Sequence, residues 1–199
     1  MAALTGKEII KQYREGNILI KPFNSNYINR NSYDVCLGAN FLYMPTDSSP
    51  MFNQNQWSEG MAQKWEDVQA SLIGQDVIDD NNLINDQFEP DDLIIVLRPG
   101  EMILAYTEEF ICPMPGQPYI GVLQTKSSIR RSYIIVDGTE VYGRWNLEIR
   151  NTSWNKLVPL KIGQKIAEIA FYTTTGELTD TAKLTTNEMY DVLEKKWSI

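Results

Sequence analysis

Chemically capable side chains gather in one stretch of the sequence, KSSIRRSYIIVDGTEVYGRWNLEI, between Lys126 and Ile149. The stretch begins with a lysine, two serines and two arginines, and a single glutamate, Glu148, lies in an apolar run near its end. Hydroxyls, cations and exposed backbone N–H groups bind phosphate, and a carboxylate can act as both general base and general acid. The stretch is therefore either a phosphate site that faces a catalytic carboxylate or a charged surface hairpin.

The residues around Glu148 alternate between apolar and polar types. In RWNLEIR, the apolar side chains occupy positions 145, 147 and 149, and the polar ones occupy positions 144, 146, 148 and 150. Because successive side chains of a strand point to opposite faces, this pattern predicts a half-buried strand with Glu148 on the polar face. A strand of this kind most often carries its charges into water, so the pattern alone does not assign a role to Glu148.

The dipeptide Asp137-Gly138 lies between the basic segment and this strand. Asp-Gly is favoured in two-residue hairpin turns, where both central residues have positive φ. We therefore expect two strands that meet at a turn centred on Asp137-Gly138.

Composition limits the classes of function. The chain has 199 residues, enough for a single domain with a core, and a net charge of -8. Proteins that bind nucleic acid or membrane surfaces generally carry an excess of Lys and Arg, so we expect neither partner. The sequence shows no apolar signal run and no stretch as long as a membrane span, and we expect a cytoplasmic protein.

The cysteine and histidine counts restrict the chemistry further. Cys36 and Cys112 are the two cysteines, and histidine is absent. Two isolated thiols do not form a disulfide framework, and they cannot supply a tetrahedral zinc site of the usual Cys/His type. We expect no zinc and no protein-held metal site, so hydrolytic chemistry would depend on carboxylates.

The remaining sequence predicts a mainly β protein. Thr5-Gly6-Lys7-Glu8 fits a capping box that starts a helix ending near Gly16. Short apolar runs separated by turn residues follow from residue 93 onward, which is typical of a β-barrel or sandwich. Residues 53–92 form a polar, acidic excursion with a weak helical pattern over 61–72, and 185–199 are predicted to form a C-terminal helix.

Six segments follow one another along the chain: LTGKEIIKQYREGNILIKPF, SYDVCLG, LRPGEMILAYTEEFICP, GVLQTKSSIRR, NLEIRNTS and PLKIGQKIAEIAFY. In this order they resemble the dCTP deaminase branch of the trimeric dUTPase superfamily. The resemblance implies a distorted, dUTPase-like β-barrel of the β-clip type, with active sites between the subunits of a homotrimer. It also implies hydrolysis of dCTP at its amino group, of dUTP at its phosphates, or of both, with Mg²⁺ bound through the triphosphate.

The resemblance also implies roles for individual residues. It places phosphate binding at Ser127, Ser128 and Arg131, flanked by Lys126 and Arg130. Glu148 would activate the water that attacks the cytosine ring, and Arg131 and Ser127 would orient water and substrate. Asp137 corresponds to an aspartate that contacts the sugar and activates water in the diphosphatase branch. Asn146 and Leu147 would also contact the substrate.

The sequence departs from the family pattern at two places near these residues. Only SYIIV stands between Arg131 and Asp137, where the family has a longer hairpin that reads the pyrimidine edge. Cys36 stands where the family usually has arginine. Because base discrimination requires paired polar groups, the shortened hairpin leaves three functions open. They are dCTP deamination to dUTP, a dUTP diphosphatase or bifunctional activity, and binding of a nucleotide or a protein partner without catalysis.

Overall fold

The protein is a mainly β structure whose strands form a nearly closed, barrel-like sheet. The computed structural model describes residues 1–43, 66–69, 71–72, 88–89, 91–141 and 143–175. The elements in chain order are α1 (Gly6–Arg14), β1 (Ile18–Lys21), η1 (Ser25–Tyr27), β2 (Tyr33–Tyr43), β3 (Glu66–Gln69), β4 (Ser71–Leu72), β5 (Leu93–Leu97), β6 (Met102–Pro113), β7 (Tyr119–Thr125), α4 (Ser127–Arg131), β8 (Ile134–Val141), β9 (Arg144–Asn151), β10 (Val158–Lys161) and β11 (Lys165–Thr173).

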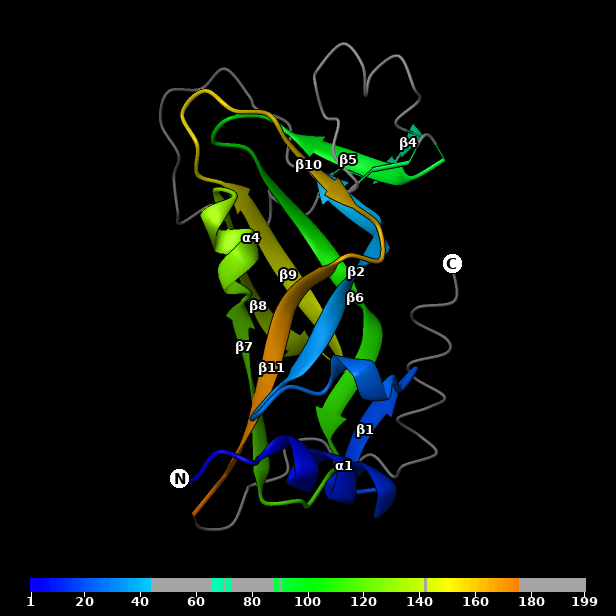
Figure 1. The fold of residues 1–199 in the computed structure, drawn as a ribbon, viewed down its shortest axis with the longest axis vertical. Helices are drawn as coiled ribbons and strands as arrows, with labels where there is room; N and C mark the ends of the chain where they lie inside the picture. The colour runs from blue at the N-terminus through cyan, green and yellow to red at the C-terminus, as the bar shows by residue number, and fades with distance from the viewer. Residues whose placement is uncertain (44–65, 70, 73–87, 90, 142, 176–199) are drawn as a thin grey trace.

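Two sheets organise these strands. The larger follows the order β7-β11-β2-β6-β9-β8, with β1 paired to β6 and β3 paired to β2, and the smaller follows β10-β5-β4. Figure 1 shows the smaller sheet at one end of an elongated molecule and α1 at the other, with α4 beside β8 and β9. The predicted mainly β barrel and its N-terminal helix are confirmed.

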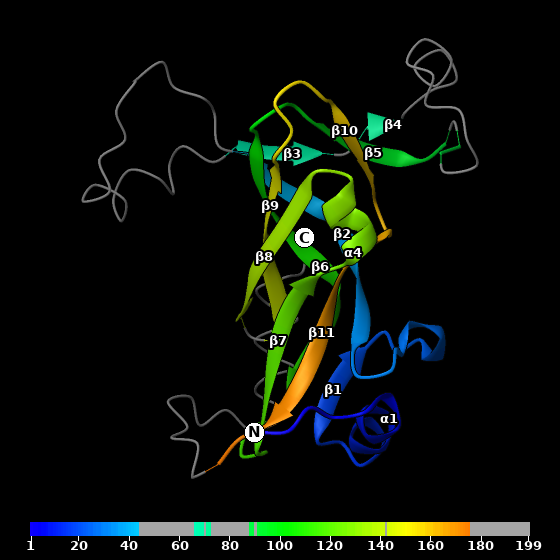
Figure 2. The same ribbon diagram turned by 60° about the vertical axis from the view of Figure 1, so that its left-hand side comes forward.

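The two end strands of the larger sheet, β7 and β8, lie against each other and bring the barrel close to closure. The link is a side chain: the Thr125 hydroxyl donates to the Val136 carbonyl at 2.7 Å and accepts from the Val136 N–H at 2.9 Å. Figure 2 shows β7 and β8 converging below α4. The closure therefore positions the segment that follows Thr125 against β8.

The core face of β9 has the predicted alternation. Trp145, Leu147 and Ile149 are buried, whereas Glu148 and Arg150 are exposed. The Trp145 indole N–H donates to the carbonyl of Ile111 on β6 at 3.0 Å, so its one polar group is satisfied in the core. Glu148 therefore lies on the outer face of β9, and the opposite face of this strand packs in the core of the barrel.

The capping interaction of α1 is also present, because the Thr5 hydroxyl accepts from the Glu8 N–H at 3.3 Å. Ile9 on this helix is fully buried, and Tyr13 stacks on Phe23 with ring centroids 4.2 Å apart. The chain leaves the helix through Gly16, whose φ of 74° favours glycine. The helix therefore docks where the sequence pattern places it.

The predicted turn at Asp137-Gly138 is wrong. Both residues lie inside β8, and the chain reverses between Val141 and Arg144, which pair across the hairpin. Gly138 is needed for close approach: a Cβ there would lie 2.8 Å from the Asn146 carbonyl oxygen. In the sequence alone, a glycine required by a closely packed neighbouring strand cannot be distinguished from a glycine required by a turn. This explains why the turn prediction at Asp137-Gly138 failed.

The weak helical pattern over 61–72 is wrong for the residues that the structure describes. Glu66–Gln69 form β3, which pairs with β2, and Ser71–Leu72 form β4, which pairs with β5. Backbone pairing with existing strands overrides the local pattern here. The predicted helix over 185–199 and most of the excursion over 53–92 lie outside the described residues. Among the described helices, none has the length and apolarity to cross a membrane.

Candidate active site

The basic segment KSSIRR forms the junction between β7 and β8. Ser127–Arg131 make the five-residue helix α4, and the Arg130 N–H donates to the Lys126 carbonyl at 2.9 Å. None of the residues of α4 is buried, and its arginines lie in its last turn. The serines and arginines of the segment are therefore presented to solvent on one short helix.

A cavity of about 420 Å³ lies beside α4 and brings several predicted residues together. It is lined by Leu123, Gln124, Thr125, Ser127, Arg130, Val136, Asp137 and Glu168. A hydroxyl and a guanidinium group from the basic segment thus share one opening with a carboxylate from β8. Its size lies within the usual range of small-molecule pockets.

Asp137 connects this cavity to Glu148. In the antiparallel pairing of β8 with β9, Asp137 lies directly opposite Glu148, and both are exposed. Directly opposed side chains project from the same face with Cβ atoms about 5 Å apart. The structure therefore brings the two predicted catalytic carboxylates side by side, although the sequence had placed one of them in a turn.

The other predicted residues divide between the surface and the core. Ser128 and Arg131 are exposed on α4, outside the lining of the cavity. Asn146 lies next to Glu148 on the outer face, and its buried Oδ1 has no hydrogen-bond partner among the described residues. Leu147 is fully buried, so its side chain points away from Glu148 and into the core. A ligand on the outer face would not contact the Leu147 side chain.

Lys126 faces a buried carboxylate rather than the opening. Its ammonium group pairs with Asp34 on β2, whose side chain is 4 % exposed. Lys165 on β11 also pairs with Asp34, at 3.1 Å, and the Asn29 amide donates to Asp34 at 2.7 Å. Lys126 thus ties the start of α4 to the centre of the barrel.

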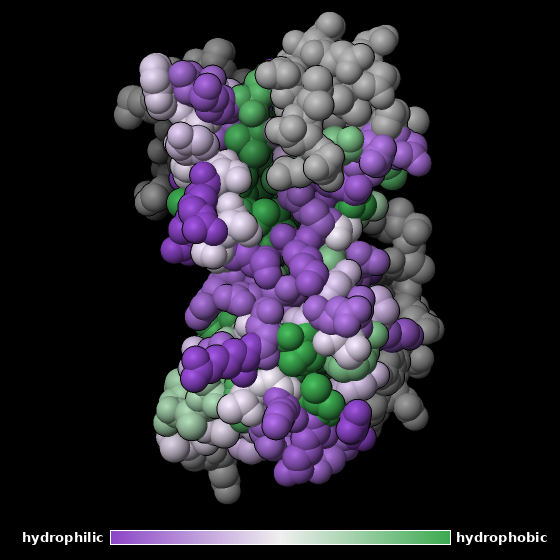
Figure 3. Space-filling model, viewed as in Figure 1, coloured by the Kyte–Doolittle hydropathy of each residue, from purple (hydrophilic) through white to green (hydrophobic). Residues whose placement is uncertain are grey.

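Glu168 on β11 completes this network. It lies opposite Asp34 in the pairing of β11 with β2, and it accepts from the Ser32 hydroxyl at 2.7 Å. The Asn29 amide donates to both Asp34, at 2.7 Å, and Glu168, at 3.4 Å. Because Glu168 also lines the cavity, this hydrogen-bond network connects the ion pairs of Asp34 with the candidate site. Figure 3 shows hydrophilic side chains gathered across the middle of this face, in the region of β2 and β11.

Sequence reasoning missed this network of ion pairs and hydrogen bonds. The available signal was an acidic residue inside an apolar strand, as with Asp34 in SYDVCLG and Glu168 in KIAEIAFY. A carboxylate inside an apolar strand is stable there only when it is paired with a cation or hydrogen-bonded. Asp34 and Glu168 therefore each indicated that a partner lies nearby. The identity of the partner depends on strand pairing across more than 90 residues of chain, which the local sequence does not reveal.

Gly138 allows a test of the corrected β8 geometry. Gly138→Ala should lower the free energy of unfolding by about 1–3 kcal/mol, because its Cβ would meet the neighbouring strand. Gly138→Asn should lower the free energy of unfolding at least as much as Gly138→Ala, because a strand interior offers no position at which Asn is favoured. If Gly138 instead lay in a turn with positive φ, Asn would be tolerated. Chemical denaturation measures both, with Thr139→Ala on the exposed face as the control. Wild-type stability of Gly138→Asn would contradict the strand geometry and support a turn at Asp137-Gly138.

The shortened connection before β8 is visible in the structure. Only Ser132 and Tyr133 separate α4 from β8, and Tyr133 has a φ of 65° with 52 % of its surface exposed. The Tyr133 carbonyl accepts from the N–H of Thr152, which fixes this connection to the end of β9. No hairpin is present between α4 and β8, so the described residues provide no counterpart to the base-reading hairpin of the resembled family.

The barrel and its solved relatives define the class of fold. The crystal structure of a 2'-deoxycytidine 5'-triphosphate deaminase from Agrobacterium tumefaciens matches 98 % of this chain with a TM-score of 0.56 and 14 % sequence identity. This chain spans about half (53 %) of that chain. At this identity the likeness shows only that the two chains share a barrel fold.

Sequence comparison then gives the family. Residues 3–174 match the sequence model of the family described as "dCTP deaminase-like", and the protein belongs to that family. A dCTP deaminase, dUMP-forming, of Methanopyrus kandleri is 26 % identical over 183 residues, covering 86 % of this chain and 82 % of its own. A dCTP deaminase, dUMP-forming, of Clostridium botulinum strain Alaska E43 is 26 % identical over 180 residues, covering 87 % and 84 %. These relatives are named as enzymes.

Proposed function

We propose that this protein deaminates dCTP to dUTP without zinc, using a water molecule activated by Glu148. One observation carries the proposal: Glu148 lies directly opposite Asp137, which lines the same cavity as Ser127 and Arg130. A carboxylate is thereby placed beside a pocket that holds a hydroxyl and a cation, the groups expected around a nucleotide triphosphate. The names of the curated relatives support the same substrate.

The chemistry requires one group that first accepts and then donates a proton. Glu148 would take a proton from water as the oxygen adds to C4 of the cytosine ring. The resulting carboxylic acid would deliver this proton to N3 of the ring. The hydroxyl proton of the addition product would then pass through Glu148 to the amino group, which leaves as ammonia while C4 becomes a carbonyl. The balance is dCTP plus water to dUTP plus ammonia. Arg131 and Ser127 would orient the water and the substrate.

The triphosphate would lie along α4. Ser127, Ser128, Arg130 and Arg131 are exposed there and can donate hydrogen bonds to phosphate oxygens. Because the Lys126 ammonium group pairs with Asp34, we propose that Lys126 acts by anchoring the start of α4. Within the described residues no cluster of three Cys, Asp or Glu side chains is arranged to hold a metal ion. Magnesium would accordingly arrive bound to the triphosphate.

We further propose that the active protein is a single-domain homotrimer with sites between subunits. Glu148 is exposed in one protomer, whereas a general base works best where water is excluded. A neighbouring subunit that covers the outer face of β9 would enclose Glu148 and give the buried Oδ1 of Asn146 a partner. Substrate contacts from Leu147 would be confined to its backbone.

A bifunctional activity is the second candidate, and two observations favour it. The curated relatives are named dUMP-forming, and Asp137 is paired with Glu148 at the cavity. In this version Asp137 would activate the water that attacks the triphosphate. Asp137→Asn should then leave ammonia release within about threefold of wild type but replace dUMP and pyrophosphate with dUTP as the product. Anion-exchange chromatography of the reaction distinguishes them. Unchanged dUMP formation by Asp137→Asn would remove Asp137 from this step.

A nucleotide panel tests the proposal against a purely binding role. The protein is incubated with dCTP, dUTP, dTTP and dATP, each with Mg²⁺, and both product and melting temperature are measured. We expect the wild-type protein to convert dCTP, and we expect dCTP to raise the melting temperature of Glu148→Gln, which should bind it with greatly reduced turnover. A rise in melting temperature with no product from any nucleotide would support a homologue that only binds. No rise with any triphosphate would contradict the phosphate site itself.

A further inference from the structure

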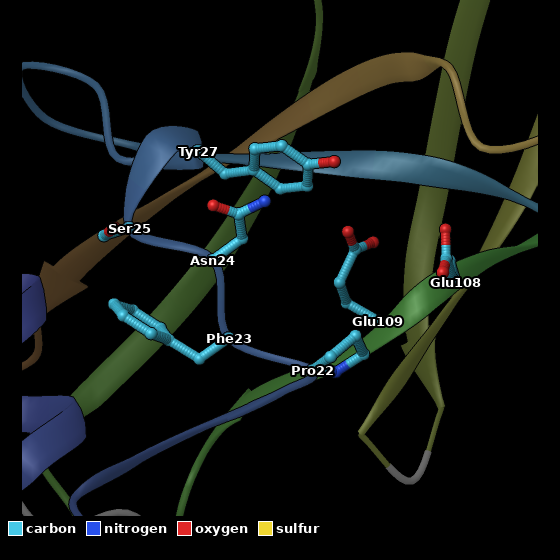
Figure 4. A pocket seen from close by; sticks show the side chains of 7 residues that line it. All are labelled: Pro22, Phe23, Asn24, Ser25, Tyr27, Glu108 and Glu109. Atoms are coloured by element: carbon cyan, nitrogen blue, oxygen red, sulfur yellow. The ribbon is translucent and has the colours of Figure 1, made fainter.

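A second cavity, of about 440 Å³, lies on a different part of the barrel, and none of the described residues that line it also lines the candidate active site. It is formed by the loop after β1 and by two successive residues of β6, and is lined by Pro22, Phe23, Asn24, Ser25, Tyr27, Glu108 and Glu109. Figure 4 shows the carboxyl group of Glu109 pointing toward the Tyr27 ring, with the Asn24 amide beside them. Among the described residues, the lining contains two carboxylates and no lysine or arginine.

Glu109 is the unusual member of this lining. It is 1 % exposed, although buried glutamates are normally paired with a cation or fully hydrogen-bonded. Its Oε2 accepts the backbone N–H of Cys36 at 2.8 Å, and no lysine or arginine of the described residues forms an ion pair with it. The Cys36 side chain and the backbone of Glu109 itself also hydrogen-bond to this carboxyl group. A carboxylate offers about four acceptor sites, so Glu109 keeps part of its acceptor capacity for a ligand in the cavity.

The strand geometry holds Glu109 in this position. The pairing of β6 shifts register between Tyr106 and Phe110 on the β9 side, and the pairing of β2 shifts between Leu37 and Phe41. The Thr107 hydroxyl donates to the Glu109 carbonyl at 2.8 Å and fixes the irregular segment. A bulge that turns a side chain out of the regular ladder is a common way to aim a functional group.

We propose that this cavity binds a guanidinium or primary ammonium group, with Glu109 as the buried counter-ion and Tyr27 as the aromatic wall. The carboxylate supplies charge and hydrogen-bond acceptors, and Asn24 supplies a further acceptor. An aromatic face attracts a cation, and the Lys165 ammonium group already lies over the Tyr27 ring, 4.3 Å from its centroid, so a bound cation would contact the remaining face of the ring. Exposed Glu108 at the opening increases the local negative potential. The cation belongs either to a free amine or guanidine or to a lysine or arginine of a second copy of this chain.

The protonation of Glu109 sets the condition for the test. Burial raises the pKa of Glu109 to about 7, and the other titratable groups that influence it are Cys36 and Glu108. Tyr27 and Tyr33 lie on the opposing side, and burial keeps the pKa of Tyr33 above its usual value. Glu109 is therefore mostly ionised at pH 8.5 and mostly protonated at pH 5.5, and a cation should bind at the higher pH.

The experiment titrates methylguanidinium chloride up to 50 mM into the full-length protein at pH 8.5, with sodium chloride at equal ionic strength as the reference, and follows the melting temperature and heat of binding. We expect a saturable, millimolar interaction that weakens at least tenfold at pH 5.5 and in Glu109→Gln. Glu108→Gln, which removes the exposed carboxylate, should weaken it less than threefold. Circular dichroism verifies the fold of each variant.

Sedimentation velocity on the same samples identifies the source of the cation. If the natural occupant is a free amine or guanidine, methylguanidinium binds without changing the sedimentation coefficient. If it is a side chain of a second copy, both methylguanidinium and Glu109→Gln shift the protein toward smaller species. Either result supports the cation site. Equal responses of wild type and folded Glu109→Gln in both measurements would overturn it.

Discussion

Glu148→Gln should lower the rate of ammonia release from dCTP by about 10³-fold, which is the usual contribution of a general acid–base residue. The amide keeps the size and most of the hydrogen bonding of glutamate but cannot accept the proton from water. Since Glu148 lies on the exposed face of β9 and is not part of the core, the substitution should leave the fold unchanged. Steady-state kinetics with a coupled ammonia assay measures the effect.

The division between kcat and KM makes this prediction specific. The KM for dCTP should change by less than about threefold, because Glu148 is assigned to the chemical step and the phosphates are assigned to α4. Glu15→Gln, at the end of α1, is the matched control and should retain full activity. Full activity of Glu148→Gln would remove this residue from the mechanism, and the exposed strand would then be no more than a solvated surface.

Asp34→Asn should cause the largest loss of stability. The substitution removes the one carboxylate that pairs with both Lys126 and Lys165 and leaves two ammonium groups beside a neutral amide. Breaking a buried ion pair costs about 3–5 kcal/mol, and the exposure of the lysines, 23 % and 37 %, reduces this to roughly 2–4 kcal/mol. Urea unfolding measures the change, with Asp92→Asn, which loses an ion pair to Lys161 in the smaller sheet, as the matched control.

The pH dependence of Asp34 has a defined sign. Burial would raise the pKa of Asp34, but the hydrogen bonds from Lys126, Asn29 and Lys165 outweigh it and hold the pKa below the ordinary value. A depressed folded-state pKa contributes stability above the unfolded pKa, near 3.8, and this contribution is lost as the pH falls through the folded value. Asp34→Asn should therefore flatten the acid limb of the stability curve. If the stability of Asp34→Asn depended on acidic pH in the same way as that of the wild type, the ion pairs of Asp34 would not contribute to stability.

The same substitution should also affect the site. Because Lys126 immediately precedes Ser127, loss of Asp34 releases the start of α4, and the KM for dCTP should rise while the residual kcat falls less. Addition of saturating nucleotide should restore part of the lost stability, since a ligand that binds only the folded state shifts the unfolding equilibrium. The ion pairs of Asp34 thus link the stability of the barrel to the position of the phosphate segment.

Local sequence pattern predicted those features of the fold that depend on local chemistry. The alternation around Glu148 gave the inward face of β9, and Thr5-Gly6-Lys7-Glu8 gave the start of α1. Turn residues between the apolar runs after residue 93 also separate strands, as between β10 and β11, where Gly163 has a φ of 76°. Each of these follows from periodicity or from a conformational preference of a few adjacent residues.

Features that depend on strand pairing were not predictable in the same way. Asp137-Gly138 has the composition of a turn. However, β8 pairs with β9 along its full length, and this pairing keeps both residues in a strand. The partner of Asp34 lies 92 residues away along the chain, and the Glu109 cavity requires register shifts on both sides of β6. The placement of Asp137 opposite Glu148 therefore came from the structure, although both residues were candidates from the sequence.

The most direct test of the central claim is a product analysis of dCTP incubated with the purified protein and Mg²⁺. Ammonia is measured enzymatically, and ³¹P NMR with chromatography identifies the nucleotide product. We predict one equivalent of ammonia for each dCTP consumed, with a deoxyuridine nucleotide as the product and a rate lowered by about 10³-fold in Glu148→Gln. Intact dCTP after prolonged incubation, or a deoxycytidine product without ammonia, would contradict the assignment of this protein as a deaminase.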